Sequence, residues 1–151
     1  MLQAGKNITQ INDPLTKIQP EYLYHAVKSP KPAVEAAIRQ LRLVHSIDKN
    51  RYRQLKKQLP YVTCGIFNPP YRRTENFGWI NHFILDIDHL GQKQLTPESL
   101  KGRLSADQRI KLAFASPGDD GLKILFTLSE KCYDPARFSL FYKAFARSFS
   151  A

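Results

Sequence analysis

Four short apolar runs constrain the fold of this chain more than any other sequence feature. One helical segment lies between the second and third runs, and another follows the fourth. Because these runs are short, rich in β-branched and aromatic residues and bounded by turn residues, we expect each to be a strand. They cover residues 61–67, 82–90, 110–116 and 121–128. Between the second and third runs, Thr96 and Pro97 predict the cap and first turn of a helix that continues to about Leu104.

The last two runs and the segment after them complete this pattern. The turn SPGDDG, residues 116–121, joins the last two runs as an antiparallel hairpin. Asp134 and Pro135 then begin a final helix with an apolar stripe of four phenylalanines, Phe138, Phe141, Phe145 and Phe149. The order predicts an α+β fold with a ferredoxin-like or RNA-recognition-type (RRM-like) palm, an incomplete β-α-β-β-α unit that lacks its last strand.

Residues 1–60 have a different character and form a basic, mainly helical N-terminal segment. Helices are predicted over residues 32–45 and 48–59, the second with Asp48 as its cap and Pro60 as its stop. The stretch before Pro32 is rich in turn residues and is expected to be irregular. We therefore predict two segments, this one and a palm-like core over residues 61–151.

The positive charge of the chain is concentrated in the first segment. The net charge is +10, and residues 1–60 hold 11 Lys and Arg against 4 Asp and Glu. Four cations of the second helix, Arg51, Arg53, Lys56 and Lys57, are predicted to contact a nucleic-acid backbone. The competing interpretation is a solvated face that only keeps the protein soluble.

The sequence disfavours a membrane protein and a protein stabilised by disulfide bonds. No apolar run approaches the roughly 20 residues of a membrane helix, and the N-terminus lacks the apolar segment of a signal peptide. We expect a cytoplasmic protein without membrane contact. Cys64 and Cys132 belong to no C-x-x-C pair, so neither a zinc ribbon nor a disulfide framework has support.

Asp86 and Asp88 end the second run, FILDIDHL, two residues apart. On a strand, side chains at i and i+2 share a face at about 6.5–7 Å, while Leu85 and Ile87 would turn into the core. Two carboxylates this close repel unless a cation lies between them, and oxygen ligands suit Mg²⁺ or Mn²⁺. Two such ions can support phosphoryl transfer. The alternative is a pair of turn or cap residues.

The D-x-D pattern also occurs in haloacid-dehalogenase-type phosphatases, in glycosyltransferases and in Toprim domains. The phosphatase motif expects Thr or Val where Leu90 stands, and an acidic pair after the lysine, whereas Asp119 and Asp120 precede Lys123. A glycosyltransferase needs a nucleotide-binding α/β half before the motif, which the two predicted helices do not provide.

A second motif lies in the hairpin SPGDDGLKILF, residues 116–126. Ser116, the backbone N–H groups of the turn and Lys123 make a reasonable cradle for phosphate. Gly118 and Gly121 would permit a positive φ and close backbone approach. An ordinary hairpin with a solvated lysine is the alternative.

D-x-D followed by S-P-x-x-x-G-L-K resembles the archaeo-eukaryotic primase superfamily. It is most similar to the branch with the VirE N-terminal or BT4734-like domain, and within it to CRISPR-associated primase-polymerases of type B. The stretch from Ile8 to Arg42 and the stretch CGIFNPPYRRTENF, residues 64–77, add to this resemblance, which covers nearly the whole chain.

The resemblance implies roles for individual residues. Asp86 and Asp88 would be ligands of two divalent metal ions, Mg²⁺ or Mn²⁺, while Ser116 and Lys123 would bind the triphosphate of an incoming nucleotide. Arg72 and Arg73 would contact triphosphate or template. Lys123 stands where classical primases have histidine, and the third acidic motif, expected on a strand after the last helix, is absent.

The sequence hypothesis is thus a primase-polymerase, a nucleotidyltransferase that binds nucleic acid and nucleoside triphosphates. By resemblance it is linked to CRISPR spacer acquisition, with adaptation proteins such as Cas1 as partners. We expect this chain to be one part of a larger protein and to turn over poorly alone. The alternative is a catalytically inactive nucleic-acid-binding module of a replication or mobile-element protein.

Overall fold

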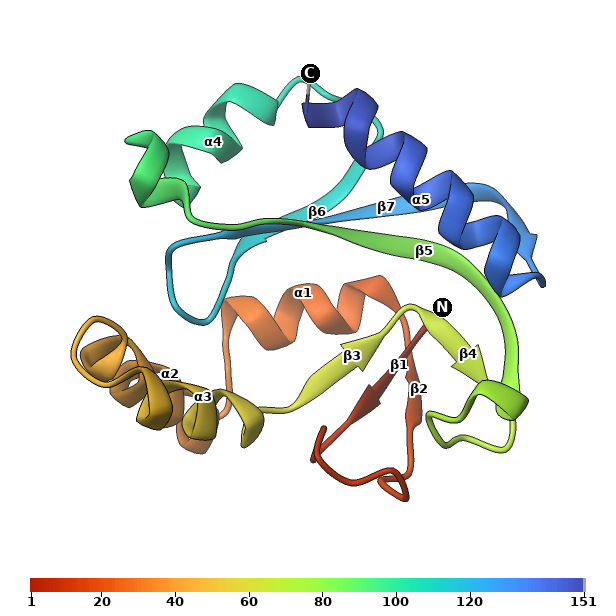
Figure 1. The fold of residues 1–151 in the computed structure, drawn as a ribbon, viewed down its shortest axis with the longest axis horizontal. Coiled ribbons are helices and arrows are strands. Elements are labelled where there is room, and N and C mark those ends of the chain that lie inside the picture. Colours follow the sequence, from red (N-terminus) through yellow and green to blue (C-terminus); the bar gives the residue numbers. More distant parts are fainter. Residues whose placement is uncertain (151) are drawn as a thin grey trace.

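The protein has an α+β fold, as the sequence predicts, and it contains two antiparallel sheets (Figure 1). The computed structural model describes residues 1–150, so Ala151, the last residue of the predicted palm segment, lies outside the described residues. One sheet has the order β2-β1-β3 and the other the order β4-β5-β7-β6. Helices α4 and α5 lie over one face of the four-stranded sheet, and α1, α2 and α3 lie on its other side (Figure 1).

The bounds of the elements follow the chain from one sheet to the other. The strands are β1 (Leu2–Gly5), β2 (Thr16–Ile18), β3 (Tyr61–Thr63), β4 (Gly65–Phe67), β5 (Phe77–Ile87), β6 (Ile110–Ala115) and β7 (Leu122–Cys132). The α-helices are α1 (Pro20–Lys28), α2 (Pro32–Val44), α3 (Lys49–Lys57), α4 (Pro97–Leu104) and α5 (Pro135–Ser150). Two short 3₁₀ helices cover Thr74–Asn76 and Leu90–Lys93.

The predicted β-α-β-β-α unit is present as β5-α4-β6-β7-α5. Strand β7 pairs antiparallel with both β5 and β6, so the β6–β7 hairpin is confirmed. Strand β4 pairs with the beginning of β5, from Phe77 to Ile80, on the side opposite β7. Phe83, Leu85, Ile124 and Phe126 are buried in the core between this sheet and α4 and α5.

Helix ends are where the sequence carries the clearest local signals. Thr96 accepts a hydrogen bond from the N–H of Ser99, and the Ser99 hydroxyl oxygen accepts one from the N–H of Thr96, a reciprocal capping box at the start of α4. Asp48 caps α3 by accepting from the N–H of Arg51. These caps stand where they were predicted.

The expected irregular structure before Pro32 is wrong. This stretch contains β1, β2 and α1, so residues 1–60 hold three helices and two strands instead of two helices alone. The single strand predicted over residues 61–67 is also two strands, β3 and β4, which lie in different sheets on either side of Cys64. Strand β3 pairs with β1, so a hydrogen-bonded sheet crosses the predicted segment boundary at residue 60.

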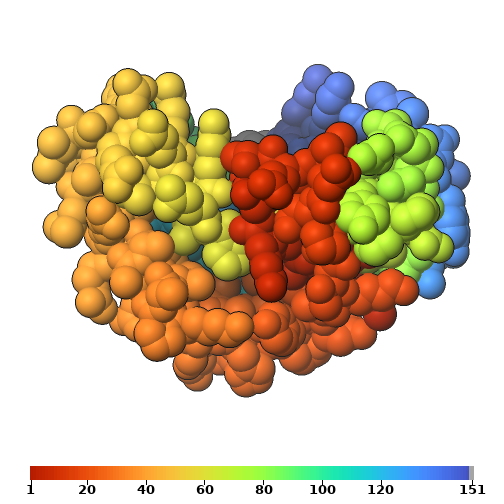
Figure 2. Space-filling model, turned by 90° about the horizontal axis from the view of Figure 1, so that it is seen from below, coloured from red at the N-terminus to blue at the C-terminus, as the bar shows by residue number. Residues whose placement is uncertain are grey.

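The N-terminal elements cover the face of the large sheet that α4 and α5 leave uncovered. Leu2 and Leu23 pack there with Leu125 of β7 and Ile84 of β5. Helices α2 and α3 form their own small core around Leu41, Leu55 and Leu59. Figure 2 views this side of the molecule, with the red N-terminal segment beside the yellow of α3 and the green loop after β4 farther along.

Candidate functional site

Asp86 and Asp88 lie at the end of β5, on the side of the sheet away from α5. Leu85 and Ile87 pack into the core with α4 and α5, as predicted, so the alternation of a strand turns Asp86 to the opposite face. Asp88 follows the last residue of β5, and both aspartates are exposed. The two carboxylates therefore lie at the surface at one end of the large sheet.

Lys123 lies directly across from Asp86 in the β5–β7 ladder. Its ammonium nitrogen is 2.7 Å from Asp86 Oδ1 in an ion pair, with the lysine side chain 28% and the aspartate side chain 47% exposed. The sequence predicted both residues as site residues, and the strand register is what brings them together. The cation thus neutralises one member of the acidic pair.

The turn between β6 and β7 lies against the same carboxylates. The N–H of Ser116 donates to the carbonyl of Gly121, and the N–H of Asp119 donates to the carbonyl of Ser116. A Cβ atom built on Gly121 would lie 3.1 Å from Ser116 Oγ and 3.2 Å from Asp88 Oδ1. The hydroxyl of one motif and the carboxylate of the other therefore approach the same point above Gly121.

The sequence predicts two reasons for the glycines of the turn, a positive φ and close backbone approach, and only the second is confirmed. Neither Gly118 nor Gly121 has a positive φ; the left-handed residue of the turn is Asp119, with φ 59°. Close approach is what requires the glycines. A Cβ on Gly121 would lie 2.9 Å from the carbonyl oxygen of Ile87, and one on Gly118 would lie 2.6 Å from the Tyr52 hydroxyl.

Tyr52 and Arg42 contact the turn, and sequence reasoning assigned neither to the site. The Tyr52 hydroxyl lies against Gly118, and the Arg42 guanidinium donates to the Pro117 carbonyl at 3.0 Å. Burial, and then the charges of Asp88 and Asp120, raise the pKa of Tyr52. Tyr52 was predicted only as a core position of its helix, and no local signal distinguishes it from one.

Asp120 links the turn to the segment after β5 by hydrogen bonds. Its carboxylate accepts a hydrogen bond from the N–H of Gly91 at 2.8 Å, and its backbone carbonyl accepts one from the N–H of Leu90. The two motifs are thus held together by backbone and side-chain hydrogen bonds as well as by the β5–β7 ladder.

The structure does not bring Arg72 and Arg73 to the carboxylates. Arg72 donates to the carbonyl of Ile8 at 2.6 Å and lies over the Tyr61 ring, and Arg73 donates to the side chain of Asn12 at 2.6 Å. Both guanidinium groups hold the loop between β1 and β2. Their predicted contact with triphosphate or template remains a prediction.

The predicted basic face of α3 is divided. At about 100° per residue, Arg53, Lys56 and Lys57 share one flank of the helix, and Arg51 lies about 120–160° away around the axis. Lys56 lies over the ring of Tyr52, with its ammonium 5.9 Å from the ring centre. One of the four cations therefore reaches the residue that contacts the turn.

Asp86 and Asp88 fit a partial ligand set for a hard divalent cation. The Asp88 carboxylate makes no hydrogen bond or ion pair with any residue that the structure describes, and Asp86 is half exposed beside Lys123. Within residues 1–150, no group of three or more His, Cys, Asp or Glu side chains is arranged to hold a metal ion. The thiol of Cys64 does not contribute, because burial raises its pKa to about 12.

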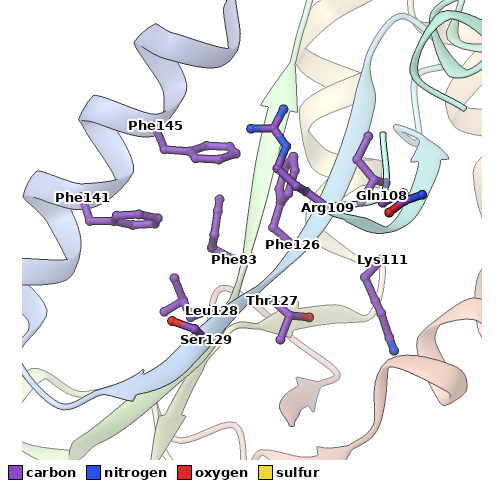
Figure 3. A pocket seen from close by; sticks show the side chains of 11 residues that line it. Phe83, Gln108, Arg109, Lys111, Phe126, Thr127, Leu128, Ser129, Phe141 and Phe145 are labelled. Atoms are coloured by element: carbon purple, nitrogen blue, oxygen red, sulfur yellow. The ribbon is translucent and has the colours of Figure 1, made fainter. Parts of the chain in front are cut away.

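A cavity of about 570 Å³ lies on the opposite side of the sheet, beside α5 (Figure 3). Phe141 and Phe145 of α5 face Phe83 and Phe126 of the sheet there, with Arg109 at the edge (Figure 3). None of the residues that line it is a predicted site residue. Its apolar walls belong to the core that supports the strands of the site.

Comparison with known proteins gives one match. A family model described as the BT4734-like N-terminal domain matches residues 54–144, which is more than half of the chain and includes both motifs. No curated protein and no solved structure matches the chain. Among the residues that the structure describes, no helix is long and apolar enough to cross a membrane.

Proposed function

The chain belongs to the family of the BT4734-like N-terminal domain, and from this membership we propose that it is the nucleotidyltransferase palm of a primase-polymerase. The observation that carries the proposal is the meeting of the two motifs at one end of the large sheet. Asp86 and Asp88 supply carboxylates there, and Ser116 and Lys123 supply donors suited to phosphate, all within one antiparallel hairpin and its neighbouring strand.

The residues of the turn would bind and orient the triphosphate of an incoming nucleotide. Ser116 offers a hydroxyl, and the N–H groups of Gly118 and Asp120 donate to no acceptor within the described residues. Lys123 adds a permanent positive charge on the adjacent strand. A rigid turn held by Asp120, Tyr52 and Arg42 presents these donors without a large ordering cost when phosphate binds.

Asp86 and Asp88 are the residues that would hold Mg²⁺ or Mn²⁺. When bound, such ions activate the attacking oxygen and neutralise charge on the leaving phosphate. Asp88 is available for this directly. Asp86 would give up its ion pair with Lys123 to bind a metal ion. Lys123 would then be free to donate to phosphate. The two carboxylates supply only part of a ligand shell of oxygen donors.

We also propose the finer features that the sequence resemblance implies. These are nucleic acid and nucleoside triphosphates as binding partners, a role in CRISPR spacer acquisition, and association with adaptation proteins such as Cas1. Retention of Cas1 from the same genome by the immobilised protein would support that association, and its absence would contradict it.

A specific observation favours a second candidate, a catalytically inactive nucleic-acid-binding module. Lys123 already neutralises Asp86, and the described residues bring no third acidic ligand to Asp86 and Asp88. In such a module the ion pair would be structural, and the basic α3 would carry the function.

Metal-dependent nucleotide transfer separates the two candidates. Nucleotide incorporation with Mg²⁺ or Mn²⁺ is measured for the protein that contains this chain and for its Asp86→Ala and Asp88→Ala variants. Because metal ions contribute several kcal/mol of charge stabilisation, each variant should lose at least about a hundredfold in rate. Glu130→Gln, which removes an exposed carboxylate from β7, should keep the wild-type rate.

A second measurement does not depend on turnover. Mn²⁺ should broaden the amide NMR signals of residues 86–88, and the two aspartate variants should lose this broadening. Undiminished incorporation by either variant would overturn the proposal. Absence of incorporation and of Mn²⁺ broadening, with nucleic-acid binding intact, would favour the inactive module.

A further inference from the structure

A polar groove lies between the loop after β1 and the exposed side of α3. It has a volume of about 440 Å³ and is lined by Lys6, Asn7, Thr9, Gln54, Lys57 and Gln58. Figure 2 shows this face, where the red N-terminal segment lies beside the yellow of α3. Gln54, Lys57 and Gln58 share one side of the helix, because they are three and four residues apart.

The chemistry of the lining suits a phosphate backbone. Every lining side chain can donate a hydrogen bond, and none is acidic. Lys6 on one wall and Lys57 on the other carry positive charges. Amides and a hydroxyl fill the space between them, which is the set of groups that contacts phosphates and sugars without reading sequence.

The wall formed by the loop is ordered by its own hydrogen bonds. The carboxylate of Asp13 accepts from the N–H groups of Lys6 and Asn7, at 2.8 and 3.0 Å, and from the Tyr61 hydroxyl at 2.8 Å. The hydrogen bond from Asn7, with the other two, lowers the pKa of Asp13, so this anchor stays ionised at neutral pH. The side chain of Asn7 in turn accepts from the N–H and hydroxyl of Thr9.

Two arginines fasten the outer part of the same loop. Arg72 holds the carbonyl of Ile8 and Arg73 holds the side chain of Asn12, both from the loop between β4 and β5. These contacts give the arginines a function in shaping the groove wall. The loop therefore presents Lys6 and Asn7 in a fixed position, which lowers the ordering cost of binding.

Helix α3 contributes residues to both the groove and the candidate site. Tyr52, near its beginning, contacts the turn at Gly118, and Lys57, in its last turn, lines the groove. Five residues of helix separate them by about 7.5 Å along the axis. Around the axis, at about 100° per residue, Tyr52 lies about 140° from Lys57 and about 160° from Gln54, so the groove and the turn lie on opposite sides of α3.

We propose that this groove binds the sugar-phosphate backbone of single-stranded nucleic acid, on the side of α3 opposite the phosphate-binding turn. Binding in this groove does not rest on the proposed function. A lysine on each wall, with uncharged donors between them, forms the kind of positively charged groove that follows a single-stranded backbone. Binding here is expected to be independent of base sequence.

The test is the salt dependence of binding to a fluorescent oligothymidylate, measured by anisotropy. Each neutralised phosphate contributes about −0.7 to the slope of log affinity against log salt for single strands, so the double variant Lys6→Gln/Lys57→Gln should reduce the magnitude of the slope by about 1.4. Affinity should fall uniformly for different base sequences. Lys101→Gln/Lys143→Gln removes the same charge from exposed positions on α4 and α5 and should leave the slope unchanged.

Competitors identify the ligand. Unlabelled single strands should displace the probe, whereas equal phosphate concentrations of duplex or of ATP should displace it poorly. An unchanged slope in the Lys6/Lys57 variant, an equal loss in the Lys101/Lys143 control, or preferred displacement by ATP or duplex would each overturn the proposal. Probe binding is measured without divalent metal ions or nucleoside triphosphates, so failure of catalysis and failure of the groove are distinguished.

Discussion

At the scale of single residues, the Asp86–Lys123 pair shows how a cross-strand register can set the charge of a site. Opposite charges directly across a sheet stabilise each other modestly, and at this exposure the pair is worth about 0.2–1 kcal/mol. The lysine is therefore a weak internal competitor of any cation that binds Asp86. A small change in free energy is enough to exchange its partner from carboxylate to phosphate.

Lys123→Gln should therefore change metal and nucleotide binding in opposite directions. Without the ammonium, Asp86 is free, so the affinity for Mn²⁺ alone should rise by up to about fivefold, the equivalent of 1 kcal/mol. The affinity for a nucleoside triphosphate should fall because a donor to phosphate is lost. Titrations followed by the electron paramagnetic resonance of free Mn²⁺ and by nucleotide fluorescence measure both. Lys101→Gln, on α4, should alter neither, and weaker Mn²⁺ binding in Lys123→Gln would refute the exchange.

At the scale of elements, the sequence predicts what is encoded locally. Helix α4 was predicted at its observed bounds because Thr96, Pro97 and the apolar pattern all lie within one short window. Strands β1 and β2 were missed because they are short and stable only through partners, one of which, β3, is more than fifty residues away. Asp119 adopts a left-handed conformation that aspartate tolerates better than most residues, but the closed turn determines that this residue, and not Gly118 or Gly121, adopts it.

The candidate site divides in the same way. Local sequence motifs are enough to predict four residues of the site, Asp86, Asp88, Ser116 and Lys123. The contact of Tyr52 with Gly118 joins residues 66 positions apart and depends on how α3 packs. No pattern along the chain encodes such a contact, which is why the helical hairpin of α2 and α3 was not expected at the turn.

A double-mutant cycle between Gly118 and Tyr52 tests this contact. Gly118→Ala places a methyl group 2.6 Å from the Tyr52 hydroxyl and should destabilise the fold by about 1–3 kcal/mol. In Tyr52→Phe the nearest ring atoms are 3.3 Å or more from that methyl group, so the same substitution should cost less. Urea unfolding of the four proteins should show a coupling of about 0.5–3 kcal/mol. Additive effects would mean that α3 does not lie against the turn.

At the scale of the whole molecule, one buried side chain joins the two sheets. Gln3 of β1 is 0% exposed. Its amide nitrogen donates to the carbonyl of Phe67 at 3.1 Å, and its amide oxygen accepts from the N–H of Phe67 at 2.9 Å. The amide thereby pairs with β4 as a neighbouring strand would, although β1 and β4 belong to different sheets. The position of the N-terminal elements over the face of Asp86 depends on this junction.

Gln3→Leu should loosen that junction while keeping the volume of the side chain. The N–H and carbonyl of Phe67 lose their partners, and because they are only partly buried, the expected loss is about 1–3 kcal/mol in the free energy of unfolding. Gln40→Leu, an exposed position on α2, serves as the matched control.

Hydrogen exchange separates this effect from a general loss of stability. Under native conditions the amide of Phe67 should exchange faster in Gln3→Leu than global destabilisation alone requires, because the Gln3 side chain accepts its hydrogen bond. Amides of the β5–β7 ladder, which Gln3 does not touch, should follow the global change. If Phe67 kept its wild-type protection relative to that ladder, the two sheets would be held together by the apolar contacts of Leu2 and Leu125 instead.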